Sequence, residues 1–122
     1  PKFDTSLLDQ ALAEQQKQRE QERLATLQQV VAWLNQHGPT YGIHQAYLFG
    51  SLIRPNRFSQ HADVDVAFEA LDANQFFPAM AALSEAVGRD VDLVELHKCP
   101  FAERIRQMGE LWTDDRPCSA NQ

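Results

Sequence analysis

The stretch that decides the fold runs from residue 46 to residue 68 and reads AYLFGSLIRPNRFSQHADVDVAF. It begins with four apolar residues, which predict a short strand buried on both faces, and Gly50-Ser51 ends that strand and opens a short helix. In residues 63–68 acidic and apolar side chains alternate with the two-residue period of a strand that has one apolar face. Residues 54–62 between them are polar and predict a loop.

The preceding part of the chain predicts one long helix. Residues 6–36 contain no Gly or Pro and are rich in good helix formers, with Ser6 and Asp9 as a capping box and Gly38-Pro39 as the stop. One face of this helix should dock on the core, and its apolar residues are Leu24, Leu27, Val31 and Leu34.

The following part predicts a helix, a strand and a last helix. A stripe formed by Phe76, Met80, Leu83 and Val87 predicts a helix that Asp72 or Asn74 caps and Gly88 closes. Residues 91–96 predict a third strand. Pro100 begins the last helix, whose apolar face carries Phe101, Ile105, Met108 and Trp112. We therefore expect an α+β fold in which helices cover a small sheet.

Composition narrows the class of protein. With 122 residues, 43% of them hydrophobic, the chain has enough apolar material for one core. No run approaches the length of a membrane span, and no signal peptide is recognisable. The widely separated Cys99 and Cys118 are interpreted as reduced thiols, which favours a cytoplasmic protein. A formal charge of -6 makes nucleic acid an unfavourable partner for a broad surface.

Acidic residues on the two later strands are the candidate catalytic groups. Asp63 and Asp65 leave the same face of one strand, and Asp92 has the same parity on the next. Asp90 and Glu69 share that parity, so the pattern does not force the choice of Asp92. Taken alone, Asp63 and Asp65 are more typical of a solvated polar face than of a metal site. A carboxylate cluster of this kind suits Mg²⁺ and the transfer of phosphoryl or nucleotidyl groups.

The Gly50-Ser51 turn is a candidate cradle for phosphate groups. Glycine permits a close approach of the backbone, a helix start presents free N–H groups, and the serine hydroxyl adds a donor. Arg54 offers positive charge to the phosphates, and Arg57 is a weaker candidate. A Gly-Ser dipeptide is an ordinary turn in most proteins, and only its place between the two strands makes it informative.

Other residues carry less weight. Trp33 and Trp112 are interpreted as core residues, and His61 is noted only because it precedes Asp63 by two positions. The chain has no Gly-Lys-Ser/Thr sequence of a P-loop, which argues against a P-loop NTPase.

Taken together, these motifs resemble a known family. Residues 48–54 followed by residues 63–66 look like the defining motif of the DNA polymerase β-like nucleotidyltransferases, and they are closest to the MNT-type minimal nucleotidyltransferases, the antitoxins of HEPN/MNT toxin–antitoxin pairs. Residues 88–94 are similar to the family's third-carboxylate strand, and residues 103–112 resemble its closing helix. The loop between Ser51 and Asp63 is one residue longer than is usual in the family. Pro55 and Ala62 also depart from its pattern.

The resemblance implies a site and a reaction. Asp63 and Asp65 would bind two Mg²⁺ ions, and Asp92 would join the catalytic ion and help to activate the acceptor hydroxyl. Gly50 and Ser51 would hold the β- and γ-phosphates of ATP, beside Arg54. The implied reaction is transfer of AMP to tyrosine hydroxyls of a cognate HEPN ribonuclease toxin, which silences the toxin.

This interpretation divides the chain into three parts. Residues 1–22 would be a polar helical extension, residues 23–113 the nucleotidyltransferase domain, and residues 114–122 a disordered tail. The extension is either solvated or a contact arm for a partner. Two alternatives stay open: an antitoxin that acts by binding alone, and a small-molecule nucleotidyltransferase of the aminoglycoside-modifying type, for which the chain has little room to hold the acceptor.

Overall fold

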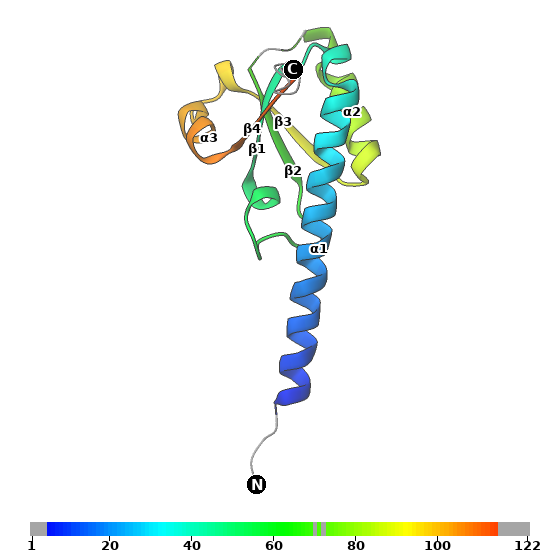
Figure 1. The fold of residues 1–122 in the computed structure, drawn as a ribbon. Helices are drawn as coiled ribbons and strands as arrows, with labels where there is room; N and C mark the ends of the chain where they lie inside the picture. The colour runs from blue at the N-terminus through cyan, green and yellow to red at the C-terminus, as the bar shows by residue number, and fades with distance from the viewer. Residues whose placement is uncertain (1–4, 70, 72, 115–122) are drawn as a thin grey trace, which may run out of the picture.

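The structure is a computed structural model that describes residues 5–69, 71 and 73–114 (Figure 1). Its helices are α1 (Ser6–His37), α2 (Phe76–Val87) and α3 (Ala102–Met108). Its strands are β1 (Gln45–Phe49), β2 (Val64–Phe68), β3 (Val91–Glu95) and β4 (Glu110–Thr113). Four short 3₁₀ turns connect them: η1 (Pro39–Tyr41), η2 (Gly50–Ile53), η3 (Ala73–Gln75) and η4 (Leu96–Lys98). The expected α+β fold with a small mixed sheet covered by helices is confirmed.

The four strands form one sheet in the order β3-β2-β1-β4. β1 runs antiparallel to both β2 and β4, whereas β2 and β3 are parallel and are joined through α2. The register places Phe49 opposite Asp65 and, on the other side, Asp65 opposite Asp92. Residues from three segments of the chain therefore meet at one end of the central strands.

The two faces of the sheet differ in what covers them. α1 and α2 lie on one face and α3 lies on the other (Figure 1). The face under α1 and α2 carries the larger core, to which the strands contribute Ala46, Leu48, Val64, Val66, Phe68, Val91 and Leu93. The face under α3 carries a smaller cluster centred on Ala67, Leu96 and Ile105. Because strand side chains alternate, Asp65 and Asp92 lie on this second face.

The last helix is the element that sequence reasoning placed wrongly. α3 ends at Met108, and the residues after Gly109 form β4, so Trp112 reaches the core from a strand and not from a helix. Phe101 and Met108 were expected on the buried face of this helix, but both are largely exposed. A short strand that pairs only at the sheet edge has little hydrophobic pattern of its own, which is why the helical spacing was misleading. The expectation that Trp33 and Trp112 are core residues is confirmed.

The long helix forms over the expected residues, but its start and its docking face differ. α1 begins at Ser6 with Thr5 in the cap position, so Ser6 is not the capping residue. Leu34 is buried and Leu27 and Val31 pack against the core, but Leu24 is 46% exposed. The buried line along the helix consists of Arg23, Thr26, Val30, Trp33 and Leu34.

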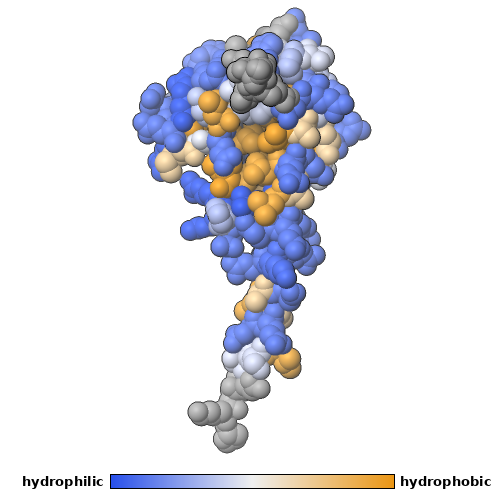
Figure 2. Space-filling model, in the orientation of Figure 1, coloured by the Kyte–Doolittle hydropathy of each residue, from blue (hydrophilic) through white to orange (hydrophobic). Residues whose placement is uncertain are grey.

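The rest of α1 extends past the sheet as a projecting arm (Figure 1). A helix of this length spans about 48 Å, which exceeds a five-residue strand roughly threefold. Figure 2 shows that this arm is mostly hydrophilic on the face in view, whereas apolar residues gather on the globular part. Leu7, Leu8 and Leu12 on the arm are all exposed.

Within the described residues, no helix has both the length and the apolar character needed to cross a membrane. Cys99 is a free thiol, whereas Cys118 and Asp72 lie outside the described residues. The tail expected over residues 114–122 also lies outside them, apart from Asp114.

Candidate active site

The Gly-Ser turn lies directly against the acidic strand. Gly50 opens η2 immediately after β1, and its φ of +77° is a conformation that favours glycine. A β-carbon at this position would overlap the carboxylate of Asp65. Ser51 follows in the same turn and is half-buried. The expected short helix after β1 is therefore present, and its first residue contacts a candidate metal ligand.

The three candidate carboxylates occupy neighbouring positions at one end of the sheet. Asp65 lies within β2 and Asp92 lies in register with it on the parallel strand β3. Asp63 was expected to be the first residue of this strand, but it immediately precedes β2. Asp65 is half-buried, whereas Asp63 and Asp92 are exposed. Parallel pairing thus brings together residues 27 positions apart in the sequence.

The electrostatics of Asp65 reflect this grouping. Burial, followed by the negative charges of Asp92 and Asp63, raises the pKa of Asp65 from 3.8 to about 6. Each cause disfavours the ionised carboxylate, and a positive ion among the three side chains would favour it. Asp65 therefore lies where negative charges from three carboxylates accumulate.

The three carboxylates offer oxygen donors of the kind that Mg²⁺ prefers. Among the described residues, no group of three or more His, Cys, Asp or Glu side chains is arranged closely enough to hold a metal ion by itself. Mg²⁺ does not need such a group, because it usually takes one or two carboxylates and completes its shell with water and substrate phosphates. The donors are all oxygen atoms, and the Gly50 turn lies next to Asp65. The residues fit a Mg²⁺ ion that arrives with a nucleotide.

Asp92 differs in its surroundings from Glu69 and Asp90, the two other acidic residues with the same strand parity. Glu69 accepts two hydrogen bonds from Arg106, at 2.9 and 3.1 Å, and Arg106 lowers the pKa of this carboxyl group. Asp90 is exposed and precedes β3, and its backbone carbonyl accepts a hydrogen bond from Val64. Only Asp92 lies in register with Asp65 among these three.

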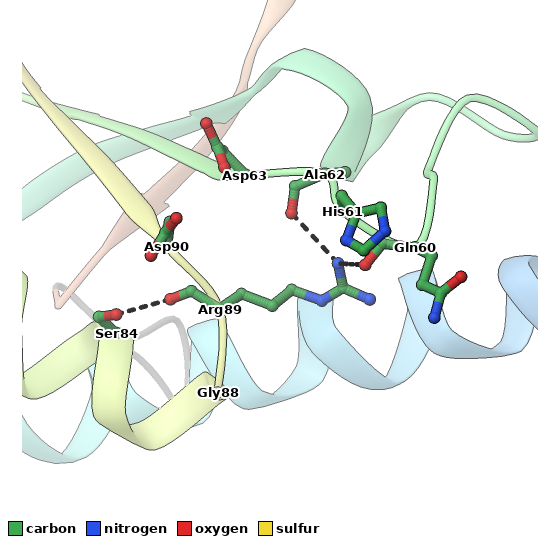
Figure 3. A pocket seen from close by; sticks show the side chains of 8 residues that line it. All are labelled: Gln60, His61, Ala62, Asp63, Ser84, Gly88, Arg89 and Asp90. Atoms are coloured by element: carbon green, nitrogen blue, oxygen red, sulfur yellow. Dashed lines mark hydrogen bonds between the residues drawn. The ribbon is translucent and has the colours of Figure 1, made fainter.

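A polar cavity of about 370 Å³ adjoins Asp63 and Asp90 (Figure 3). His61 also lines it, with Asp63 two residues further on. The side chain of Arg89 crosses it and donates hydrogen bonds to the carbonyls of Gln60 and Ala62, at 3.0 and 3.1 Å (Figure 3). Sequence reasoning did not identify Arg89, because its partners lie in a loop 27 or more residues earlier.

Arg89 also fixes the remainder of this loop. Its guanidinium lies 4.3 Å from the ring centre of Phe58, which is buried. Phe58 therefore anchors the loop between Ser51 and Asp63 in the core. Arg89 holds the last residues of this loop, immediately before β2 in the sequence.

A second cavity, of about 310 Å³, lies between the Gly-Ser turn and α3. Gly50 and Arg54 line it together with Arg104 of α3. The remaining walls are apolar and come from Phe49, Ile53, Ile105 and Met108. Arg57, the weaker candidate, lies elsewhere, in a groove against α1. Arg104 reaches this cavity only because α3 folds back over the sheet, so sequence spacing gave no signal for it.

These features define a nucleotidyltransferase core: a mixed sheet backed by two helices, with a Gly-Ser turn against the acidic strand. The sequence model described as polymerase beta, nucleotidyltransferase matches residues 28–116, and the chain belongs to this family. The class of reaction is therefore nucleotidyl transfer.

A solved structure has a similar fold. The chain is similar to a chain of the crystal structure of the toxin-antitoxin MntA-HepT, with a TM-score of 0.52 and 23% sequence identity. The similarity covers 74% of this chain and 72% of that one. No curated protein matches the chain.

Proposed function

We propose that this protein is a Mg²⁺-dependent nucleotidyltransferase that transfers AMP from ATP to tyrosine hydroxyls of a HEPN ribonuclease toxin and thereby neutralises it. The observation that carries the enzymatic part is the position of Asp65, which contacts the Gly50 turn on one side and lies in register with Asp92 on the other. The antitoxin role is supported by the similarity of fold to a chain of the toxin-antitoxin MntA-HepT. The two-cysteine composition favours the cytoplasm as the place of action.

The carboxylates have distinct roles in this proposal. Asp63, Asp65 and Asp92 would hold two Mg²⁺ ions together with the phosphates. When bound, the ions neutralise charge on the triphosphate and on the attacking oxygen. The acceptor oxygen forms a bond to the α-phosphorus, the bond from that phosphorus to the bridging oxygen breaks, and pyrophosphate leaves. Asp92 is exposed, so an acceptor hydroxyl can approach it and give up its proton there.

The turn and the two arginines would position the nucleotide. Gly50 permits the backbone to approach the phosphates closely, and the Ser51 hydroxyl donates a hydrogen bond to them. Arg54 and Arg104 line the cavity beside this turn and supply positive charge to a chain whose net charge is -6. The apolar walls of that cavity suit a nucleobase or ribose.

The test is a transfer assay with a HEPN ribonuclease toxin as the acceptor. With ATP labelled at the α-phosphate and Mg²⁺, we expect label on the toxin and a mass increase of one or more AMP units. Asp65→Asn and Asp92→Asn should abolish the transfer, while the exposed neighbour Asp90→Asn should retain it. Full transfer by Asp65→Asn would show that the site is assigned wrongly. Transfer to small-molecule acceptors but not to the toxin would favour the aminoglycoside-type alternative.

One observation favours the alternative of an antitoxin that acts by binding. The projecting arm of α1 exposes Leu7, Leu8 and Leu12, of which Leu7 is 80% exposed. Such side chains on an otherwise polar helix are contact points for a partner. If binding alone neutralises the toxin, Asp65→Asn will still protect cells, and replacement of Leu7, Leu8 and Leu12 by serine will abolish the protection. If transfer is required, Asp65→Asn will bind the toxin and leave it active.

A further inference from the structure

A buried arginine connects the long helix to the Gly-Ser turn. Arg23 of α1 is only 7% exposed, and its Nη1 donates a hydrogen bond of 3.0 Å to the backbone carbonyl of Leu52. Leu52 lies in η2, directly after Ser51. The guanidinium therefore holds the turn that would bind the phosphates, at a position two residues after Gly50.

Glu20 fixes this arginine and extends the connection to the following loop. Its Oε2 accepts hydrogen bonds from Nε and Nη2 of Arg23, at 3.1 and 2.5 Å. Its Oε1 accepts a hydrogen bond of 3.0 Å from the backbone N–H of Asn56, a residue with a φ of +66°. The hydrogen bonds from Arg23 and from Asn56 lower the pKa of Glu20, so this carboxylate stays ionised at neutral pH.

The arrangement has the features of a positioning device. A buried guanidinium is costly unless its donors find partners, and here a carboxylate and a carbonyl accept three hydrogen bonds from it. The planar fork of arginine binds both partners in one orientation, which lysine cannot do. At one end of the segment 52–56 the carbonyl of Leu52 accepts a hydrogen bond from Arg23, and at the other end the N–H of Asn56 donates one to Glu20, so α1 determines where that segment lies.

Both residues lie outside the segment that matches the family. The match begins at residue 28, whereas Glu20 and Arg23 precede it. We propose that Arg23, held by Glu20, is a positioning residue for nucleotide binding, so that this part of α1 belongs functionally to the nucleotide site. The inference rests on the proposed function, because it assumes that the Gly50-Ser51 turn holds the phosphates of ATP.

The test separates nucleotide affinity from turnover. Arg23→Met removes the donors but keeps an apolar side chain of similar length, Arg23→Lys restores one donor, and Glu20→Gln removes the charge that holds the guanidinium. Lys17→Met, at an exposed position of the same helix, is the matched control. Calorimetry with a non-hydrolysable ATP analogue and Mg²⁺ gives the dissociation constant, and amide exchange over residues 50–57 reports the turn without any nucleotide.

We expect Arg23→Met to weaken nucleotide binding about tenfold, the equivalent of one hydrogen bond to a charged group. KM for ATP should rise by the same factor while kcat changes little, and exchange over residues 50–57 should quicken. Arg23→Lys should recover part of the affinity, Glu20→Gln should show a smaller loss, and Lys17→Met should match the parent. Should Arg23→Met fail to fold, Glu20→Gln carries the test, because Glu20 is only half-buried.

Two results would overturn the inference, and they are distinguishable. If the parent binds the analogue and the Arg23 and Glu20 variants bind it equally well, the positioning role is wrong while the proposed function stands. If the parent binds no nucleoside triphosphate in the presence of Mg²⁺, the proposed function fails and the positioning role fails with it.

Discussion

The α-carbon of Gly50 lies so close to the carboxylate of Asp65 that no side chain fits between them. One residue ends the first strand and the other lies in the second, and antiparallel pairing of Phe49 with Asp65 brings them together. The turn that would hold the phosphates and the carboxylate that would hold the metal ion are therefore parts of one small structure.

Gly50→Ala should disable the enzyme. The added methyl group meets the Asp65 carboxylate, and the positive φ disfavours alanine, so we expect a loss of about 1–3 kcal/mol in the free energy of unfolding. Displacing the turn and the carboxylate should lower kcat/KM by about 100-fold. Gly88→Ala is the control, because Gly88 has a φ of +67° but no neighbouring atom near an added methyl group. It should cost about 1 kcal/mol and leave transfer intact. Equal activity of the two variants would contradict the role of the contact.

Asp65→Asn should stabilise the protein in the absence of metal ions while it abolishes transfer. The pKa of Asp65 is about 6 in the folded protein and 3.8 without its surroundings. A carboxyl group with a raised pKa favours the folded state below pH 3.8, and this contribution is lost as the pH rises through about 6. Ionised Asp65 therefore lowers the stability of the parent at neutral pH, by no more than about 1 kcal/mol after solvent screening.

Thermal unfolding measured over a range of pH tests this. The melting temperature of Asp65→Asn should exceed that of the parent by a few degrees at about pH 8, and the difference should vanish near pH 4. Mg²⁺ with a nucleotide should raise the melting temperature of the parent and change that of Asp65→Asn much less. A variant that is less stable than the parent at about pH 8 would show that the three carboxylates do not repel one another as inferred.

Substitution of Asp92 should lower kcat strongly, whereas the same substitution at Asp90 should change it little. They lie two residues apart and have the same parity, but only Asp92 is in register with Asp65. We expect Asp92→Asn to lower kcat by at least about 100-fold, as loss of a proton acceptor and metal ligand would. Asp90→Asn should stay within about threefold of the parent, since a surface substitution changes little. Steady-state kinetics at saturating ATP makes the comparison, and a reversed order would exclude Asp92 as the third carboxylate.

Arg89→Met should loosen the loop that leads to Asp63. It removes the hydrogen bonds to the carbonyls of Gln60 and Ala62 and the contact with the Phe58 ring. We expect a loss of about 1–3 kcal/mol in stability and faster amide exchange over residues 58–63. Arg89→Lys should recover only part of this, because an ammonium group lacks the planar fork. Arg57→Met, in the exposed part of the same loop, is the control and should leave exchange unchanged. No change in exchange for Arg89→Met would mean that Phe58 alone holds the loop.

Much of this molecule is specified by local pattern. Alternation in residues 63–68 predicts β2, and the absence of Gly and Pro from residues 6–36 predicts α1, because these preferences act over a few neighbouring residues. The Gly50-Ser51 turn and the acidic residues around it were identified for the same reason. Pattern failed at β4, a four-residue edge strand whose pairing with β1 depends on residues more than 60 positions away.

The sequence by itself determined the set of acidic groups, the turn and the family, since each is carried by residues close together in the chain. Only the tertiary structure decided which acidic residue joins Asp65, because Asp92, Asp90 and Glu69 differ in pairing and not in parity. It also decided the supporting residues: Arg23, Arg89 and Arg104 reach the site from three distant segments. A hydrogen bond or an ionic contact between distant segments leaves no periodic pattern in the sequence. Such contacts form only when the chain folds, and they could therefore not be predicted from the sequence alone.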